Sequence, residues 1–268
     1  MYNYVTIKSY KPLNNKQIEV LKILYRFRFG TSELIALLMN QSTIYTRTRL
    51  NRLLDQDYIA RNYDSSYKLR GIAANYYLTP KAIKLLKNNN KLDQKGLHLL
   101  YYNKRASAKF IKHWLDIFRI YLKLMELYKN KLEFFTSTEI TNQDQFPRPK
   151  LDSYLTINNS NYFLELLDNS MSYTLLKRKV NKHIKHYETE ELKGDYPTIL
   201  LICSTEAIKA MITKYLRYTL DKMGIDELEF LITTKKQLLK QKDNKQTIWR
   251  AMMGEDEELF NIAIRGRI

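Results

Sequence analysis

The run at residues 198–203, TILLIC, constrains the fold of this chain more than any other segment. It is almost continuously apolar, whereas a strand with one face in water alternates apolar and polar residues. Such a strand is buried on both faces, so its sheet needs helices on both sides. The neighbouring sequence provides candidates, because residues 173–190 and 205–223 have helical spacing and residues 229–233 are strand-like. We therefore predict a mixed α/β sheet covered by helices in the C-terminal half.

The first third of the chain has a different order. Residues 14–29, the segment following Thr31, and residues 43–56 have helical spacing, with Gly30 as the expected stop of the first helix. The period then changes to two at residues 58–61 and 75–79, which are joined by a polar loop, and Pro80 begins a fourth helix that extends to about residue 91. Three helices followed by a two-stranded hairpin are the order of a winged helix-turn-helix. The predicted class is therefore α+β.

The third helix is the predicted recognition helix. Its apolar side is expected to contain Ile44, Leu50, Leu53 and Leu54, which leaves a polar side to enter a major groove. Arginine can bind guanine edges through two hydrogen bonds, and hydroxyl groups suit phosphates or bases. The candidate DNA-binding residues are Thr43, Tyr45, Arg47, Arg49 and Arg52 on this helix, with Lys68 and Arg70 on the wing.

The charge of the chain supports a polyanionic partner. Lysine and arginine number 45 against 28 acidic residues, which gives a net charge of +17. The excess is uneven, because residues 1–95 contain 17 basic and 6 acidic residues, a net +11. DNA, RNA and an anionic membrane surface all fit such a charge. Together with the winged-helix order, it predicts double-stranded DNA as the partner.

The chain is expected to contain two domains and a connection. Residues 1–95 form the winged helix-turn-helix domain, residues 96–130 contain a linker, with residues 93–96 as its candidate start, and a bridging helix, and residues 131–268 form the α/β domain. Within the α/β domain, residues 133–140, 150–157 and 162–167 are strand-like, and residues 158–161 form a turn between the last two.

Two acidic residues lie on the neighbouring arms of this predicted hairpin. Asp152 follows the segment RPKL, and Glu165 ends the segment YFLE, after which comes a helix that contains Lys179 and Tyr187. This arrangement resembles the PD-(D/E)xK nuclease superfamily, which implies a restriction-endonuclease-like fold. The resemblance further implies that Asp152 and Glu165 hold Mg²⁺ or Mn²⁺.

The sequence departs from the nuclease pattern at two positions. Leu167 stands two residues after Glu165, where the pattern has the lysine that helps activate the attacking water, and Leu151 stands where it has proline. A replacement lysine would have to come from the next helix, where Lys177, Lys179 and Lys182 are the candidates. The expected catalytic set of an active enzyme is Asp152, Glu165, Lys179 and Lys182, but the missing lysine favours little or no activity. No other cofactor is expected.

The whole order, a winged helix, an aromatic and basic helix and a degenerate nuclease-like domain, resembles the bacterial replication-relaxation family. That resemblance implies a sequence-specific DNA-binding protein of a mobile element, which acts in plasmid replication or mobilisation. It would mark an origin and recruit a relaxase or a replication initiator. A homodimer is left open.

Two other functions are compatible with the sequence: a metal-dependent endonuclease targeted by the winged helix, and a winged-helix transcriptional regulator. The chain contains no phosphate-binding loop and no HExxH or CxxC motif. The single cysteine, Cys203, lies in the apolar run, and His113 is expected to be a packed histidine on the bridging helix. No membrane span or apolar signal core is visible, so we expect a cytoplasmic protein associated with the nucleoid or a plasmid.

Overall fold

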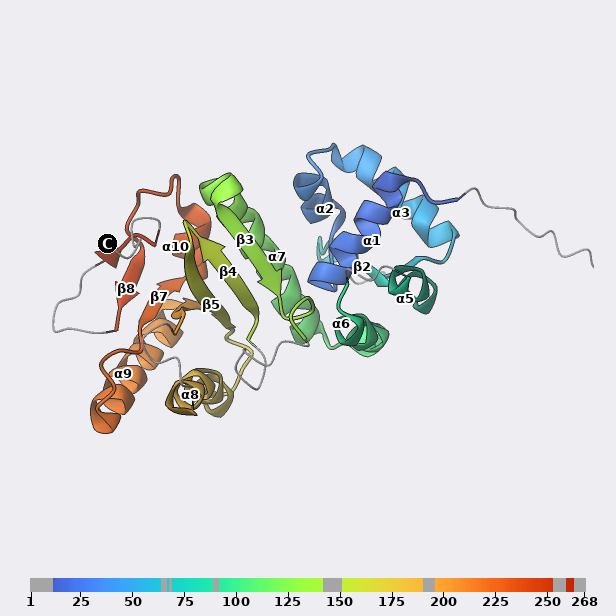
Figure 1. The fold of residues 1–268 in the computed structure, drawn as a ribbon. Helices are drawn as coiled ribbons and strands as arrows, with labels where there is room; N and C mark the ends of the chain where they lie inside the picture. Colours follow the sequence, from blue (N-terminus) through green and yellow to red (C-terminus); the bar gives the residue numbers. More distant parts are fainter. Residues whose placement is uncertain are drawn as a thin grey trace, which may run out of the picture. The chain divides into compact units, whose positions relative to one another are not determined.

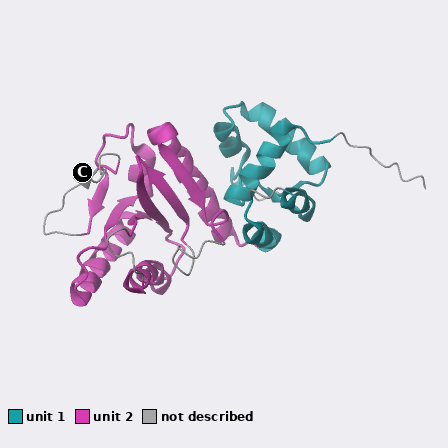
Figure 2. Cartoon of the chain, viewed as in Figure 1, with its two compact units in different colours: residues 1–105 teal, residues 106–268 magenta. Residues whose placement is uncertain are grey.

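The structure, a computed structural model, describes residues 12–63, 67, 69–88, 92–141, 151–189, 196–252 and 259–262. The chain divides into two compact units, residues 1–105 and residues 106–268 (Figure 2). The division lies within the segment 96–130, where a linker and a bridging helix are expected. Each unit has buried hydrophobic residues of its own, and we describe each unit by itself.

Unit 1 has the order of a winged helix-turn-helix (Figure 1). Its elements are α1 (Asn15–Phe27), α2 (Ser32–Leu38), α3 (Thr43–Asp55), β1 (Ile59–Asn62), β2 (Asn75–Leu78), α5 (Pro80–Lys87), α6 (Gln94–Leu99) and the 3-10 helix η1 (Leu100–Arg105). Strands β1 and β2 pair antiparallel, with Ile59 opposite Leu78. This confirms the prediction of helices followed by a hairpin wing.

Side-chain caps begin the helices of unit 1 where the sequence places hydroxyl or amide groups. Asn14 and Gln17 form a reciprocal capping box at the start of α1. The hydroxyls of Thr31, Ser42 and Thr79 accept backbone N–H groups at the starts of α2, α3 and α5. These local bonds fix the short turns between the helices and therefore set α3 across α2.

The role expected for Gly30 is wrong in one respect. Helix α1 ends at Phe27, and the left-handed turn is made by Arg28, with a φ of 62°. Gly30 instead pairs with Tyr76 across an isolated β-bridge. A Cβ atom there would lie 3.0 Å from Ile35 Cδ1. The glycine therefore allows close packing against Ile35 of α2 and Leu24 of α1, and it does not end the helix.

The expected start of a linker at residues 93–96 is also wrong. Asp93 caps α6 by accepting the N–H of Gly96 at 2.7 Å. Leu97 and Leu100 are fully buried or nearly so, and Asn103 accepts two hydrogen bonds from the Arg28 guanidinium, one of them from Nε at 2.9 Å. This segment therefore packs into unit 1 as α6 and η1.

Unit 2 is built on a seven-stranded mixed sheet in the described part of the chain. Its elements are α7 (Ala108–Tyr128), η2 (Lys129–Lys131), β3 (Leu132–Thr136), β4 (Ser153–Ile157), β5 (Ser160–Leu167), α8 (Tyr173–Thr189), β6 (Thr198–Cys203), α9 (Glu206–Met223), β7 (Phe230–Thr234), α10 (Lys235–Lys240), β8 (Trp249–Ala251) and β9 (Leu259–Phe260). The strand order follows the chain, with β5, β6 and β7 parallel and the other pairs antiparallel. The mixed sheet is confirmed.

The apolar run that predicted this sheet forms its centre. Residues 199–203 of β6 are fully buried. Ile199, Leu201 and Cys203 belong to one hydrophobic cluster with the inner faces of α8 and α9. Leu200 and Ile202 point to the opposite face by alternation, where α7 and α10 contact the edge and centre of the sheet (Figure 1). Both faces of β6 are therefore covered.

No helix in the described ranges is long and apolar enough to cross a membrane.

The turn between β4 and β5 sets the register of these two strands, and this register decides how Asp152 and Glu165 lie relative to each other. Asn158 and Asn159 make its turn with φ values of 50° and 66°, the left-handed conformation that asparagine tolerates and that two-residue hairpin turns require. Ser153 then pairs with Leu164. Extension of the same register by one residue brings Asp152 opposite Glu165.

Candidate functional site

The exposed surface of α3 is the first candidate site. Thr46, Leu50 and Leu53 are its buried residues, spaced so that they share one side of the helix. Tyr45 is 72% exposed, and Arg52 is also exposed, whereas Thr43 and Arg49 are half-buried. Tyr45, Arg49 and Arg52 line a groove of about 430 Å³ between α3 and the start of α1.

One residue of α3 differs from the expectation. Ile44, expected on the apolar side, is 75% exposed. The buried side is fixed by Thr46, Leu50 and Leu53, and Ile44 precedes Thr46 by two residues, a rotation of about 200° around the helix axis at 3.6 residues per turn. Thr46 can occupy the buried side because its hydroxyl donates to the Ser42 carbonyl at 3.1 Å. The surface available to a partner therefore includes an isoleucine.

Two candidate arginines of α3 have partners within unit 1. Arg47 forms an ion pair with Glu33 at 2.9 Å, and Arg49 donates to the Gln41 side chain at 2.5 Å. Both contacts orient a guanidinium on the helix surface. A surface ion pair such as that of Arg47 contributes about 0–1 kcal/mol, and a single hydrogen bond such as that of Arg49 contributes about 0.5–1.5 kcal/mol. A DNA phosphate or base can therefore replace either contact.

The wing contributes further cations near α3. Arg61 of β1 and Arg47 line a second groove, of about 490 Å³. The Arg70 guanidinium lies 5.9 Å from the Tyr67 ring centre, and Arg70 itself is exposed. Lys68, the other wing residue expected to contact DNA, lies outside the described residues.

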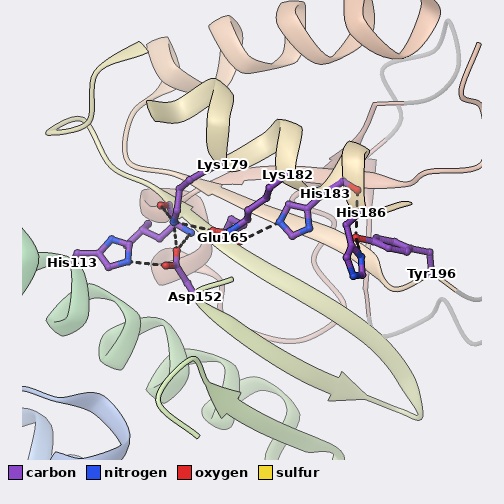
Figure 3. A network of polar contacts seen from close by, with 9 residues as sticks. His113, Asp152, Glu165, Lys179, Lys182, His183, His186 and Tyr196 are labelled. Atoms are coloured by element: carbon purple, nitrogen blue, oxygen red, sulfur yellow. Dashed lines mark hydrogen bonds and ion pairs between the residues drawn. The ribbon is translucent and has the colours of Figure 1, made fainter. Parts of the chain in front are cut away.

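A buried polar cluster in unit 2 is the second candidate site (Figure 3). Glu165, on β5, has a fully buried side chain. Lys179, Lys182 and His183 face it from one side of α8, because residues three and four apart share a helix face. The ammonium groups of Lys179 and Lys182 lie 2.8 and 2.5 Å from the Glu165 carboxylate. His183 Nε2 lies 3.1 Å from Glu165 Oε1.

Asp152 completes this cluster from the residue before β4. Its Oδ2 atom accepts the N–H of Leu166 at 2.8 Å and lies 2.5 Å from Lys179 Nζ. Its Oδ1 atom lies 3.0 Å from Nε2 of His113, on α7. Lys179 therefore bridges the two carboxylates (Figure 3), and the cluster joins α7, β5, α8 and the segment before β4.

The electrostatics keep the carboxylates ionised. Burial by itself would raise the pKa of Glu165, but the ammonium groups of Lys179 and Lys182 lower it to about 2. Burial also opposes ionisation of Asp152, and Lys179 and His113 hold its pKa well below the usual value. The two carboxylates raise the pKa of Lys179 despite its burial. Burial lowers the pKa of His183 to about 4, so this imidazole is neutral at pH 7.

The arrangement does not fit a divalent metal ion. Two carboxylates face two ammonium groups, so the cluster is formally neutral, and a cation between Asp152 and Glu165 would have to displace Lys179. Within the described ranges, no group of three or more histidine, cysteine or acidic side chains is placed to hold a metal. Hard cations need several oxygen ligands, and here lysine nitrogens take their place.

Asp168, a third carboxylate near the cluster, has a separate role. Its Oδ1 atom accepts the N–H of Ser170 at 2.8 Å, which forms the turn after β5. Its Oδ2 atom lies 3.2 Å from Lys112 Nζ. Lys112 also contacts the buried Asp116, which forms a 2.6 Å ion pair with Lys235. This second network joins α7, the end of β5 and α10.

The structure brings together all four residues of the expected catalytic set. Asp152, Glu165, Lys179 and Lys182 meet in one cluster, whereas Leu167 enters the hydrophobic core on the α8 side of the sheet. His113 and His183 were not expected to contact the carboxylates. The spacing of His183 from Lys179, four residues along a helix, was a usable signal, but nothing in the sequence connects His113 with Asp152.

Comparisons with known proteins identify one family. The family model described as "Replication-relaxation" matches residues 21–199, more than half of the chain. No match was found among curated proteins. Among solved structures, a mutant of ZitR from Lactococcus lactis is 18% identical with a TM-score of 0.26, over 38% of this chain and 68% of that chain. A MepR-like protein complexed with pseudoligands is 20% identical with a TM-score of 0.27, over 42% and 73%. These superpositions are too partial to support an inference.

Proposed function

The chain belongs to the replication-relaxation family, and from that premise we propose that it is a sequence-specific double-stranded DNA-binding protein. Its role would lie in the replication or mobilisation of a plasmid or other mobile element. Unit 1 would mark an origin, and unit 2 would contribute to recruitment of a relaxase or a replication initiator.

The single observation that carries this proposal is the exposed side of α3. It follows α2 after a tight turn, the arrangement in which a recognition helix enters the major groove with its N-terminal residues near base edges. Ile44 and Tyr45, at that end, are 75% and 72% exposed. Apolar side chains there can contact thymine methyl groups, and Arg49 can contact guanine.

The remaining cations of unit 1 would position the protein on the DNA. Arg52 is exposed one turn after Arg49, and Arg61 and Arg70 belong to the wing region. Such residues suit phosphates, which fix orientation but carry no sequence information. The excess positive charge of residues 1–95 supports this division of roles.

The first test selects a preferred DNA sequence from a random duplex library and then compares variants on it. Arg49→Ala should weaken specific binding by about 1–3 kcal/mol and relax the preference at one base pair. Lys84→Ala is the matched control, because Lys84 is an exposed cation on α5 that lines neither of the two grooves beside α3. Equal affinity of both variants for the selected duplex would show that α3 is not the recognition helix.

The second candidate function is a metal-dependent endonuclease. One observation favours it: Lys179 lies beside both carboxylates, where a replacement for the missing lysine has to be. The neutral, closed ion-pair cluster argues against it, so we propose that the cluster stabilises unit 2 and is not an active site.

Supercoiled plasmid distinguishes the two roles of the cluster. With Mg²⁺ or Mn²⁺ present, we expect the parent protein to nick plasmid no faster than Asp152→Ala. Nicking that requires Mn²⁺ and disappears in Asp152→Ala would instead establish an endonuclease.

A further inference from the structure

A groove between α9 and β8 gathers positive charge in unit 2. It has a volume of about 410 Å³ and is lined by Lys209, Lys214 and Arg217 of α9 and by Arg250 of β8. Glu206 is the one acidic residue among its described lining residues. The groove lies on a different helix from the polar cluster of Asp152 and Glu165, and none of the cluster residues lines it.

Lys209 shows that this groove is more than a solvated helix face. The residue is only 8% exposed. Its described side-chain contact is a 3.4 Å hydrogen bond to Oε1 of Gln237, a neutral amide, and no ion pair joins it to a carboxylate within the described ranges. Lys209 therefore adds its charge to a lining in which four cationic side chains face one described carboxylate, that of Glu206, and such an excess of positive charge favours an anionic ligand.

The shape of the groove distinguishes between kinds of anion. Lys209 and Arg217 are eight residues apart on α9, which corresponds to about 12 Å along the helix. That length exceeds one phosphate group, whereas a DNA backbone presents a charge about every 3.4 Å along each strand. Arginine is well suited to phosphate oxygens because its planar guanidinium can donate two parallel hydrogen bonds.

We propose that the α9 groove of Lys209, Lys214, Arg217 and Arg250 binds the phosphate backbone of duplex DNA. This contact is independent of sequence, and it does not rest on recognition by α3. It gives the protein a second attachment to DNA, through unit 2.

The test measures binding of the full chain to a duplex of arbitrary sequence, about 40 base pairs long, over a series of salt concentrations. The variant Lys214→Gln, Arg217→Gln removes two exposed groove cations. It should bind more weakly and lower the slope of log affinity against log salt by up to about 2, since each lost phosphate contact lowers it by about 0.9. The matched control Lys222→Gln, Lys240→Gln removes two exposed cations of α9 and α10 outside the groove, and should keep the parent slope.

Lys209→Met separates a binding role from a structural one. The described side-chain contact of Lys209 is a long hydrogen bond to a neutral amide, so its replacement should leave the thermal midpoint close to that of the parent, while DNA affinity falls. Both groove variants should also weaken DNA binding when Arg49→Ala and Arg52→Ala are already present. The groove proposal can therefore be tested separately from the proposal that α3 recognises DNA.

Three results would overturn the proposal. The first is an unchanged salt slope in the double groove variant, and the second is an equal loss of slope in the control. The third is calorimetric binding of inorganic phosphate that Lys209→Met abolishes while DNA affinity is unchanged, which would identify a pocket for free phosphate.

Discussion

At the scale of single residues, Lys179 is the most informative side chain of unit 2. It lies on α8, yet its ammonium group lies within 3 Å of both Asp152 and Glu165. It is the cation that the two carboxylates share, whereas Lys182 pairs with Glu165 and His113 with Asp152. Loss of a partner from a buried ion pair destabilises a fold by several kcal/mol. The same lysine occupies the space that a metal ion would need, so one residue both stabilises the cluster and limits its chemistry.

His183 gives a prediction about pH at this scale. In the folded protein its pKa is about 4, and in the unfolded chain it returns to about 6.5. The unfolded state therefore binds more protons between these values, so stability is fully present above pH 6.5 and is lost as the pH falls toward 4. Between pH 6.5 and pH 4, uptake of this one proton by the unfolded state lowers the free energy of unfolding by up to about 1.4 kcal/mol for each unit of falling pH.

Urea unfolding of the parent and His183→Gln between pH 8 and pH 4 checks this prediction. Glutamine can still donate to Glu165 but does not titrate, so the variant should lose less stability between pH 6.5 and pH 4. The difference at pH 8 measures the direct cost of the substitution and serves as the control. Parallel curves for the two proteins would contradict the shifted pKa of His183.

At the scale of elements, α3 and the wing present different side-chain types, which suit them to different roles on DNA. The outer side of α3 combines apolar and cationic groups, such as Ile44 and Arg49, and so offers contacts that can distinguish bases. The wing contributes cations beside aromatic rings, as in the Arg61 pair with Tyr63. Cations that contact phosphates act with little dependence on sequence.

The variant Lys68→Gln, Arg70→Gln tests this division on the selected duplex. Loss of two phosphate contacts should lower the slope of log affinity against log salt by up to about 2 and leave the preferred sequence unchanged. Lys84→Gln should have no effect on the slope. A changed sequence preference would assign the wing to base recognition instead of the phosphates.

At the scale of the whole molecule, the chain is two compact units with separate cores. Hydrogen bonds connect Arg28, at the C-terminal end of α1, with Asn103 of η1, the last element of unit 1. The first helix and the last element of the unit are therefore held together. We therefore expect residues 1–105 alone to unfold cooperatively and to retain the sequence preference of the full chain.

The separated unit also tests how the two proposed DNA contacts combine. It should show a shallower salt slope than the full chain on a long duplex, because the α9 groove is missing, and this is checked by titrations of both proteins on one duplex. If residues 1–105 fail to fold, or fold and prefer a different sequence, the independence of unit 1 is wrong.

The sequence by itself determined the features that depend on local order. Helical spacing followed by period-two segments predicted the winged helix, and the apolar run at 198–203 predicted a strand covered on both faces. These patterns are readable because secondary-structure periodicity and caps act over a few neighbouring residues. The resemblance to the nuclease superfamily, together with the predicted helix, suggested Lys179 and Lys182 as replacement lysines.

Only the tertiary structure decided which distant side chains meet. His113 and Asp152 are 39 residues apart, and their contact depends on how α7 packs against the sheet. Gly30 is a close-packing position because side chains of α1 and α2 lie against it, and Ile44 is exposed because three other residues fix the buried side of α3. Sequence periodicity does not predict such contacts. Local preferences allow several faces and several partners, and only the packing of the whole unit determines which of them meet.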